Sequence, residues 1–265
     1  MNNILDEIIA HKKIEVEQRK KQKSYANIRA LAEEHLEAKD FGCALLPMSD
    51  APIRIIAECK KMSPSKGLMC VNYNPASIAK AYEKGGAAAI SVLTDEKYFG
   101  GSLEDLKKVR DITTLPILRK DFIIDEYQIF EARAAGADSF LLLSGVLDYA
   151  QLQYFIEIGR DLGMEPLIES HNKEQLEAAL KTDGKILGIN NRNLSTFSVD
   201  LQHSKELYNQ AKGNLNQRVL VCESGIKNSS DITKMKKVGF KAFLVGEALI
   251  TNDNHEEAVR QLTFS

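Results

Sequence analysis

Charged and amide side chains close several of the apolar, strand-like runs in this sequence. Glu58 and Lys60 end one run, and Asn190 and Arg192 end another. Because side chains alternate along an extended strand, residues two apart point to the same side, so each pair is aimed at one place. Other runs end in further residues of this kind: Lys120, Glu169 and Glu223. Lysine and glutamate can donate and accept protons, so the set favours general acid–base chemistry.

Motifs for several other kinds of catalysis are missing. The sequence has no H-E-x-x-H, no P-loop and no G-x-S-x-G. Its histidines are scattered without the spacing of metal ligands. Lysine and glutamate therefore remain the acid–base candidates, which suits proton transfer on a sugar phosphate.

Two glycine-bearing turns follow the last two apolar runs. Ser224-Gly225 follows one, and Gly246-Glu247 follows the other. Backbone N–H groups at such turns can bind phosphate, and glycine permits a close approach. The segment 63–67 adds hydroxyls, a cation and a glycine near the same predicted site. The sequence therefore predicts a phosphorylated substrate.

Eight apolar runs alternate with amphipathic helical segments after residue 53. The predicted strands are Ile53–Cys59, Ala89–Leu93, Pro116–Arg119, Ser139–Leu143, Glu165–Ile168, Ile186–Ile189, Arg218–Cys222 and Ala242–Val245. Strands that alternate with helices form parallel sheets, and eight such units favour a closed (β/α)8 TIM barrel with ligands at the C-terminal strand ends. The alternative is an open doubly wound sheet, but the first strand is not followed by its G-x-G-x-x-G motif.

The first 50 or so residues have a different pattern. Helical spacing without Gly or Pro predicts a helix from Asn3 to about Lys23, and a weaker pattern predicts a second over 27–39. A loop marked by Gly42, Pro47 and Pro52 follows. We therefore divide the chain into a helical extension, residues 1–50, and a barrel domain, residues 51–265.

Composition and charge exclude several classes of protein. The 265 residues are 44% hydrophobic and 27% charged, as in ordinary globular chains. A net charge of -2 gives no overall attraction for nucleic acid or anionic membrane. No apolar run approaches the roughly 20 residues of a membrane helix, and the N-terminus lacks the order of a secretory signal, so we expect a cytoplasmic protein. Its four cysteines include no C-x-x-C pair, which indicates free thiols.

Ordered motifs along nearly the whole chain resemble the indole-3-glycerol phosphate synthase family. They are Ile56–Gly67, Ser91–Ser102, Leu118–Glu126, Glu165–Glu169, Gly188–Leu194, Glu223–Ile226 and Leu244–Glu247. The resemblance implies that 1-(2-carboxyphenylamino)-1-deoxyribulose 5-phosphate is converted to indole-3-glycerol phosphate, carbon dioxide and water in tryptophan biosynthesis. It also implies a carboxy-lyase with no cofactor and no metal.

The resemblance further implies a role for each polar residue at the strand ends. Lys120 is the general acid for ring closure, and Glu169 is the general base for the later dehydration. Lys60 and Arg192 hold the substrate carboxylate, and Lys60 is also a candidate acid in dehydration. The remaining residues orient hydroxyls and stabilise the developing positive charge: Glu58, Asn190 and Glu223.

Substrate contacts and partners are implied in the same way. The phosphate contacts are Ser63, Ser224, Gly225, Gly246 and Glu247. The aromatic ring contacts are Pro64, Phe122, Leu141 and Leu244. The N-terminal extension packs over the barrel mouth and helps bind substrate. We expect a monomer whose partner is the small phosphorylated substrate, and the sequence leaves open an association with neighbouring pathway enzymes.

Some positions depart from the commonest family pattern. The stretch Cys70–Asn74 replaces a usually more acidic one, and Glu247 stands where some members have Ser. Phosphoribosylanthranilate isomerase and the tryptophan synthase α-subunit are alternatives, but they lack the Glu-x-Lys-x-x-Ser-Pro-Ser opening. A non-catalytic phosphate-ligand sensor would be expected to have lost an acid or a base, whereas this chain keeps both.

Overall fold

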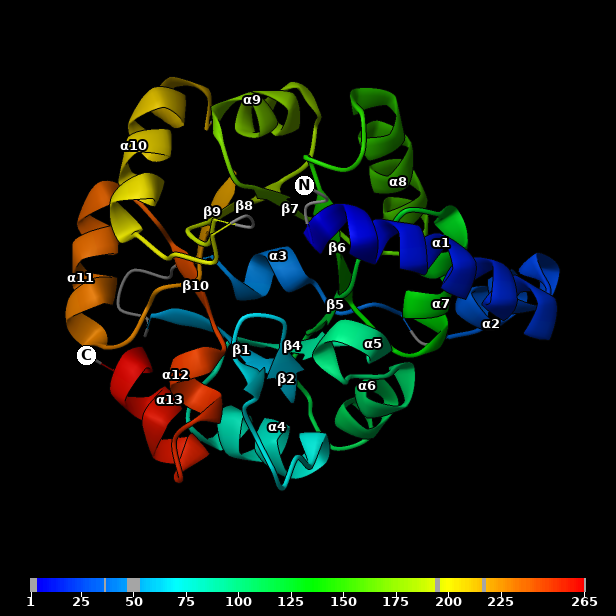
Figure 1. Ribbon diagram of the computed structural model, residues 1–265, viewed down its shortest axis with the longest axis horizontal. Coiled ribbons are helices and arrows are strands. Elements are labelled where there is room, and N and C mark those ends of the chain that lie inside the picture. Colours follow the sequence, from blue (N-terminus) through cyan, green and yellow to red (C-terminus); the bar gives the residue numbers. More distant parts are fainter. Residues whose placement is uncertain (1–3, 36, 47–52, 194–195, 216–217, 265) are drawn as a thin grey trace.

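The computed structural model describes residues 4–35, 37–46, 53–193, 196–215 and 218–264. Among these residues, eight parallel strands pair side by side and close into a barrel surrounded by helices (Figure 1). The strands, in order around the barrel, are β1 (Arg54–Cys59), β4 (Ala89–Leu93), β5 (Ile117–Lys120), β6 (Ser139–Leu143), β7 (Leu167–Ser170), β8 (Ile186–Asn190), β9 (Val219–Glu223) and β10 (Ala242–Val245). The predicted (β/α)8 TIM barrel is confirmed, and a helix precedes it.

Helices follow each barrel strand and lie outside the barrel. They are α4 (Pro75–Lys84), α5 (Glu96–Phe99), α6 (Leu103–Arg110), α7 (Glu126–Ala134), α8 (Tyr149–Asp161), α9 (Lys173–Lys181), α10 (Leu201–Ala211) with the 3-10 turn η1 (Lys212–Asn214), α11 (Ser229–Val238), α12 (Glu247–Ile250) and α13 (His255–Thr263). Asp, Asn or Ser side chains accept a hydrogen bond from the first turn of most of them, which satisfies backbone N–H groups that have no partner within the helix. A small hairpin of β2 (Met62–Ser63) and β3 (Gly67–Leu68), which the sequence pattern did not predict, follows β1.

Several strands extend further toward their C-terminal ends than predicted. Lys120, Asn190 and Glu223 all lie within strands, because parallel pairing continues through Leu93↔Lys120 and Asn190↔Glu223. β7 starts later than predicted, at Leu167. Pro166 has no N–H to donate to the ladder.

The inward-facing positions change character along the barrel. Near the strand starts they are apolar and form one buried cluster, which includes Ile56, Leu118, Leu167 and Val221. The residues between them along each strand face outward and pack against the helices in a larger buried cluster. Two residues further along, the inward positions of β1, β5, β7 and β9 are charged, as at Glu58 and Lys120, whereas those of β6 and β10 stay apolar. The alternation therefore delivers polar side chains to one end of the barrel.

A short helix closes the other end. α3 (Phe41–Ala44) occupies the start of the segment predicted as a loop, and Gly42 lies within it. The Asp40 carboxylate accepts a hydrogen bond of 2.7 Å from the Cys43 N–H and so caps the helix. Phe41 and Leu45 are buried in the same cluster as the inward residues of the strand starts. The prediction missed this helix because its apolar residues act through contacts distant in sequence.

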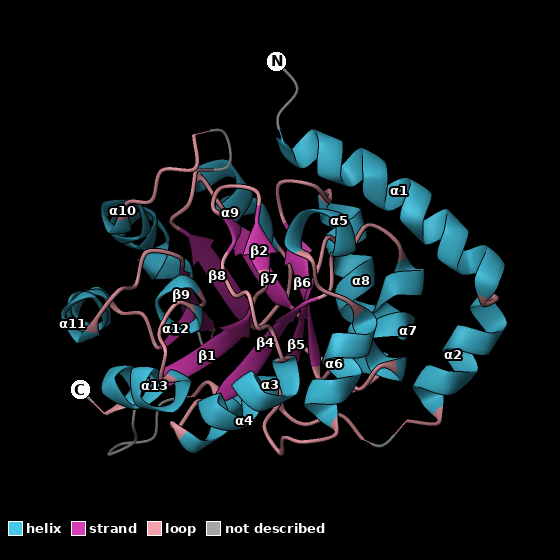
Figure 2. Ribbon diagram, turned by 60° about the horizontal axis from the view of Figure 1, so that its bottom comes forward, coloured by secondary structure: helices cyan, strands magenta, loops and turns pink. Residues whose placement is uncertain are grey.

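Two further helices precede α3, and the first of them begins on the opposite side of the barrel from it (Figure 2). α1 spans Ile4–Gln22, and α2 spans Tyr25–Glu33, shorter than predicted. Ser24 separates them and caps α2, accepting a hydrogen bond from the Asn27 N–H at 3.3 Å. The predicted domain boundary between residues 50 and 51 lies outside the described residues, as do Asn3, Pro47, Pro52 and Leu194. Among the helices described, none is long and apolar enough to cross a membrane.

The closure of the barrel by α3 predicts a large loss of stability on truncation of Phe41. Phe41 is 1% exposed, so Phe41→Ala should lower the free energy of unfolding by about 3–5 kcal/mol, measured by urea denaturation. Phe264 is 65% exposed, so Phe264→Ala is the matched control and should cost about 1 kcal/mol or less. Equal losses in the two variants would contradict the role given to α3.

Candidate active site

The C-terminal strand ends surround a cavity of about 650 Å³. Its walls combine charged, polar and apolar residues from all eight barrel strands and from the segments that follow them. The residues predicted from the sequence that line it are Glu58, Lys60, Lys120, Phe122, Leu141, Glu169, Asn190, Arg192, Glu223, Ser224, Gly225, Leu244, Gly246 and Glu247. The structure thus brings together all of the predicted site residues except Ser63 and Pro64.

Lys120 lies at the centre of a buried charge cluster. Its Nζ is 2.5 Å from Glu169 Oε2 and 3.1 Å from Glu223 Oε2. Asn190 Nδ2 donates to Glu169 Oε1 at 3.0 Å, and His171 Nε2 is 3.2 Å from the same oxygen. β5, β7, β8 and β9 therefore each contribute a polar group to one small volume.

Burial and charge act in opposite directions on these groups. Burial alone would lower the pKa of Lys120, but the carboxylates of Glu169 and Glu223 raise it above its usual range. Burial would raise the pKa of Glu169, but Lys120 and then His171 lower it to about 2. Burial and the neighbouring Glu169 carboxylate raise the pKa of Glu223 well above its usual range. One lysine thus faces one carboxyl whose pKa is lowered and another whose pKa is raised. Such a difference between neighbouring groups separates acid and base roles.

Two glycines create the space for these side chains. Gly188 is an inward position of β8, and a Cβ there would overlap Glu223 Oε1. Gly246 follows β10, and a Cβ there would overlap Glu58 Oε1 and lie 3.0 Å from Lys60 Nζ. Lys60 and Glu58 are joined by an ion pair of 2.6 Å. Any larger residue at either glycine would displace a charged side chain.

The turn after β9 has an unusual backbone. Ser224 has φ 62° and Gly225 has φ 89°, so two successive residues adopt the left-handed region. A serine rarely adopts this region without local support, and such strain concentrates at functional turns. The turn after β10 leads directly into α12, whose first turn has no side-chain cap. The first N–H groups of a helix have no partner within it, and Gly246 and Glu247 at the start of α12 line the cavity, as do Ser224 and Gly225.

Ser63 and Pro64 lie in an adjoining pocket of about 90 Å³. The two pockets share Lys60, Phe122, Arg192 and Glu247, so they form neighbouring parts of one mouth. The apolar side chains of α1 that line the smaller pocket are Ile4, Leu5 and Ile8. The N-terminal helix is thus part of the wall.

The sequence reasoning missed several residues of the mouth. His171 stands two residues after Glu169, so the spacing that singled out Glu58 and Lys60 could have identified it. Burial lowers the pKa of His171, although the neighbouring Glu169 carboxylate acts in the opposite direction. Other lining residues had no comparable signal, because they stand outside the strands: Phe99, Phe197, Lys227 and Thr251. Within the described ranges, no three His, Cys, Asp or Glu side chains are placed to hold a metal ion.

The Lys120–Glu169 pair predicts how Glu169 titrates. Because the pKa of Glu169 is lowered from 4.5 to about 2, the stability from this pair is present above pH 4.5 and lost as pH falls toward 2. Glu169 should therefore remain ionised between pH 7 and about 4, measured from its carboxyl 13C shift.

In Lys120→Met the same carboxyl should take up a proton within that range, since burial opposes its charge and the ammonium that offsets burial is removed. Lys60→Met is the control, because Lys60 pairs with Glu58 instead. An unaltered Glu169 titration in Lys120→Met would rule out the proposed coupling.

Comparison with known proteins identifies the family. A family model described as indole-3-glycerol phosphate synthase matches residues 5–262. A protein of that name from Endomicrobium trichonymphae is 44% identical over 259 residues, covering 98% of this chain and 99% of its own length. Those from Laribacter hongkongensis and Neisseria meningitidis serogroup C are each 43% identical, covering 99% of this chain and 99% and 100% of their own lengths.

The fold is also found in more distant solved structures. Thiamine phosphate pyrophosphorylase from Pyrococcus furiosus aligns with a TM-score of 0.57, covering 79% of this chain and 93% of its own. At 16% identity this likeness concerns the barrel fold alone. The family match is different in kind, since it spans nearly the whole sequence and includes every strand that lines the mouth. The chain belongs to the indole-3-glycerol phosphate synthase family.

Proposed function

We propose that this protein is a cytoplasmic, cofactor-independent carboxy-lyase of tryptophan biosynthesis. It converts 1-(2-carboxyphenylamino)-1-deoxyribulose 5-phosphate to indole-3-glycerol phosphate, carbon dioxide and water. The observation that carries the proposal is the position of Lys120 between Glu169 and Glu223 in a mouth that also holds Lys60 and Arg192. Family membership supports it independently.

Ring closure is assigned to Lys120. The aromatic carbon that bears the carboxylate attacks the ketone carbon of the open-chain sugar, and a carbon–carbon bond forms. Lys120 donates a proton to the ketone oxygen, which makes the carbon electrophilic and neutralises the developing alkoxide. The bond to the carboxylate then breaks and releases carbon dioxide. The raised pKa of Lys120 keeps it protonated before substrate arrives, and a substrate that draws Glu223 away weakens the hold on that proton.

Dehydration is assigned to Glu169. The former ketone oxygen leaves as water, and Glu169 removes a proton so that the indole ring becomes aromatic. The lowered pKa of Glu169 keeps it in the ionised form that a base requires. Lys60 is the second candidate acid for the leaving water. Glu223 Oε1 is buried and has no hydrogen-bond partner among the described residues, so it is available to a substrate hydroxyl or amine.

Substrate binding is divided between the two sides of the mouth. Lys60 and Arg192 hold the carboxylate, while Glu58 and Asn190 orient hydroxyls. The proposed phosphate contacts are Ser63, Ser224, Gly225, Gly246 and Glu247. Glu247 contributes mainly its N–H, because its carboxylate already pairs with Lys66 at 3.3 Å and Arg192 at 3.6 Å. The proposed contacts to the aromatic ring are Pro64, Phe122, Leu141 and Leu244.

The direct test is to incubate the purified protein with the carboxyphenylamino-deoxyribulose phosphate and a chelator, and to follow indole fluorescence. Formation of indole-3-glycerol phosphate is the expected result. Tight binding of substrate without product would instead indicate a phosphate-ligand sensor. Absence of binding would favour another phosphate-binding barrel activity.

Removal of the proposed acid should abolish most turnover without abolishing binding. Lys120→Ala is expected to lower kcat by about 10²–10⁴-fold while product still binds, measured by steady-state kinetics and by titration with indole-3-glycerol phosphate. Lys241 is exposed and precedes β10 at the other end of the barrel, so Lys241→Ala is the control and should keep full turnover. Wild-type kcat in Lys120→Ala would refute the assignment.

A further inference from the structure

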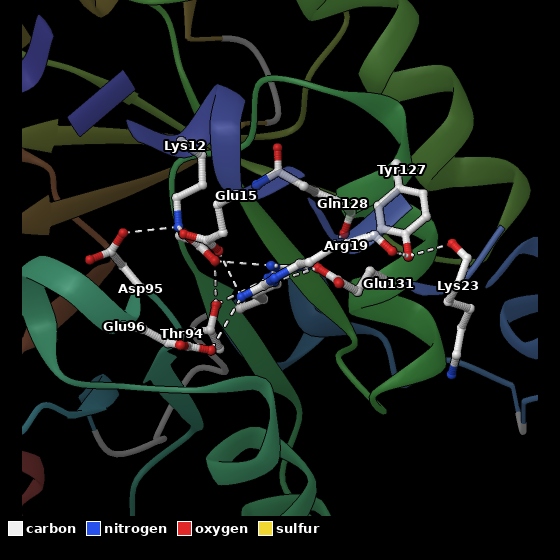
Figure 3. Close-up of polar contacts among 12 residues, drawn as sticks. Lys12, Glu15, Arg19, Lys23, Thr94, Asp95, Glu96, Tyr127, Gln128 and Glu131 are labelled. Carbon is white, nitrogen blue, oxygen red and sulfur yellow. Dashed lines mark hydrogen bonds and ion pairs between the residues drawn. The ribbon is translucent and has the colours of Figure 1, made fainter. Parts of the chain in front are cut away.

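A completely buried lysine joins α1 to the barrel beside the candidate site. Lys12 has 0% of its side chain exposed, and its Nζ lies 2.9 Å from a carboxylate oxygen of each of Glu15, Asp95 and Asp121. Asp95 follows β4 and Asp121 follows β5, so one ammonium connects three separate segments. Figure 3 shows Lys12 reaching from α1 toward Asp95.

The carboxylates around Lys12 belong to a wider network. Arg119, also 0% exposed, pairs with Asp121 and with Glu131 of α7, both at 2.9 Å. Arg19 of α1 pairs with the same Glu131 at 2.9 Å and with Glu15 at 2.7 Å (Figure 3). The network therefore joins α1, the ends of β4 and β5, and α7 through charged side chains alone.

The charges in this network are maintained despite burial. Burial would lower the pKa of Lys12, but Asp121, Asp95 and Glu15 raise it above its usual range. Burial would raise the pKa of Asp121, but Lys12 and Arg119 lower it below its usual range. Buried ion clusters give little net stability, because desolvation offsets their attraction. Such a cluster is better explained by the geometry that it imposes.

That geometry concerns the strand end that carries Lys120. Lys120 pairs with Leu93 on the β4 side, whereas the ladder to β6 covers only Leu118 and Arg119. The strand is thus held on one side at this residue. Side chains alternate, so Lys120 enters the cavity while the next residue, Asp121, points outward to the network.

Asp121 fixes the chain immediately after Lys120. Its carboxylate accepts hydrogen bonds from Thr94 Oγ1 at 2.7 Å and from the Phe122 N–H at 2.8 Å, in addition to its ion pairs. Phe122 lines the cavity. Lys12 supplies the only one of these partners that comes from outside the barrel, among the described contacts of Asp121.

We propose that Lys12 is a positioning residue, which holds Asp121 and thereby sets the position of Lys120 in the site. The proposal rests on the proposed function only in taking Lys120 as the acid. α1 then acts on catalysis through the backbone of β5 as well as through its own wall of the mouth.

The test separates positioning from the mere attachment of α1. Lys12→Met removes the ammonium with little change in length. Arg110→Met is the matched control, because Arg110 pairs with buried Asp138 at 2.7 Å near the N-terminal strand ends, away from the site. Both variants should lower the melting temperature. Only Lys12→Met should lower kcat, on the order of 10- to 100-fold, with a smaller change in KM.

A double variant makes the distinction sharper. Lys12→Met with Asp95→Asn removes one of the unpaired carboxylates and should restore part of the melting temperature. The Asn side-chain oxygen can still accept from the Tyr98 N–H, as Asp95 does at 2.8 Å. The kcat should stay low, because Asp121 still lacks its partner on α1. A kcat that rises and falls with melting temperature across these variants would overturn the proposal. The double variant also replaces Lys12→Met if that single variant does not fold.

A readout without substrate keeps the two proposals distinguishable. The side-chain 15N signal of Lys120 is identified by its absence in Lys120→Ala. It should shift in the Lys12 variants and stay in place in Arg110→Met. An unchanged signal in all variants would overturn the positioning role. A wild-type protein that produces no indole-3-glycerol phosphate would overturn the proposed function, and the 15N signal would still decide the role of Lys12.

Discussion

The site depends on one buried electrostatic arrangement, a lysine ammonium between two glutamate carboxyls. Without Lys120, Glu169 and Glu223 would oppose each other in a place with little water to screen them. Without the carboxyls, burial would drive the proton from Lys120. No single strand can satisfy both requirements. A closed barrel can, because its strand ends converge from all sides on one small volume.

The same barrel has opposite character at its two ends. At the floor, the inward positions are apolar and α3 covers them with Phe41 and Leu45. At the mouth, the next inward positions of β1, β5, β7 and β9 are charged, and α1 covers the mouth partly with apolar residues and partly with the Lys12 network. At the floor, apolar side chains are buried and stabilise the fold, and no charged group has to be removed from water. The mouth can then hold ionised groups that contribute little to stability.

Much of this arrangement could be predicted from the sequence, and the reason is local. Strand alternation relates Glu58 to Lys60 and Asn190 to Arg192 over two residues, and apolar runs mark the strands themselves. The features that were missed depend on contacts distant in sequence. α3 begins within a segment that carries loop signals. Lys12 lies on the same helix face as the buried Ile8 and Val16, but the helix is rich in Lys and Glu and its partners Asp95 and Asp121 are distant in sequence, so the pattern could not identify the ion pairs. The chemical roles of the site residues stay predictions.

The two glycines of the mouth bear on how this gene can vary. The room for Glu223 and for the Glu58–Lys60 pair is set by atoms that Gly188 and Gly246 lack. Every amino-acid replacement of a glycine adds atoms, so any substitution at these two positions can only reduce the space beside them. A side chain at either glycine would push the end of Glu223, or of the Glu58–Lys60 pair, away from its present place. Drift at these positions is therefore tied to change in the charges around them, whereas an outward-facing surface position can vary alone.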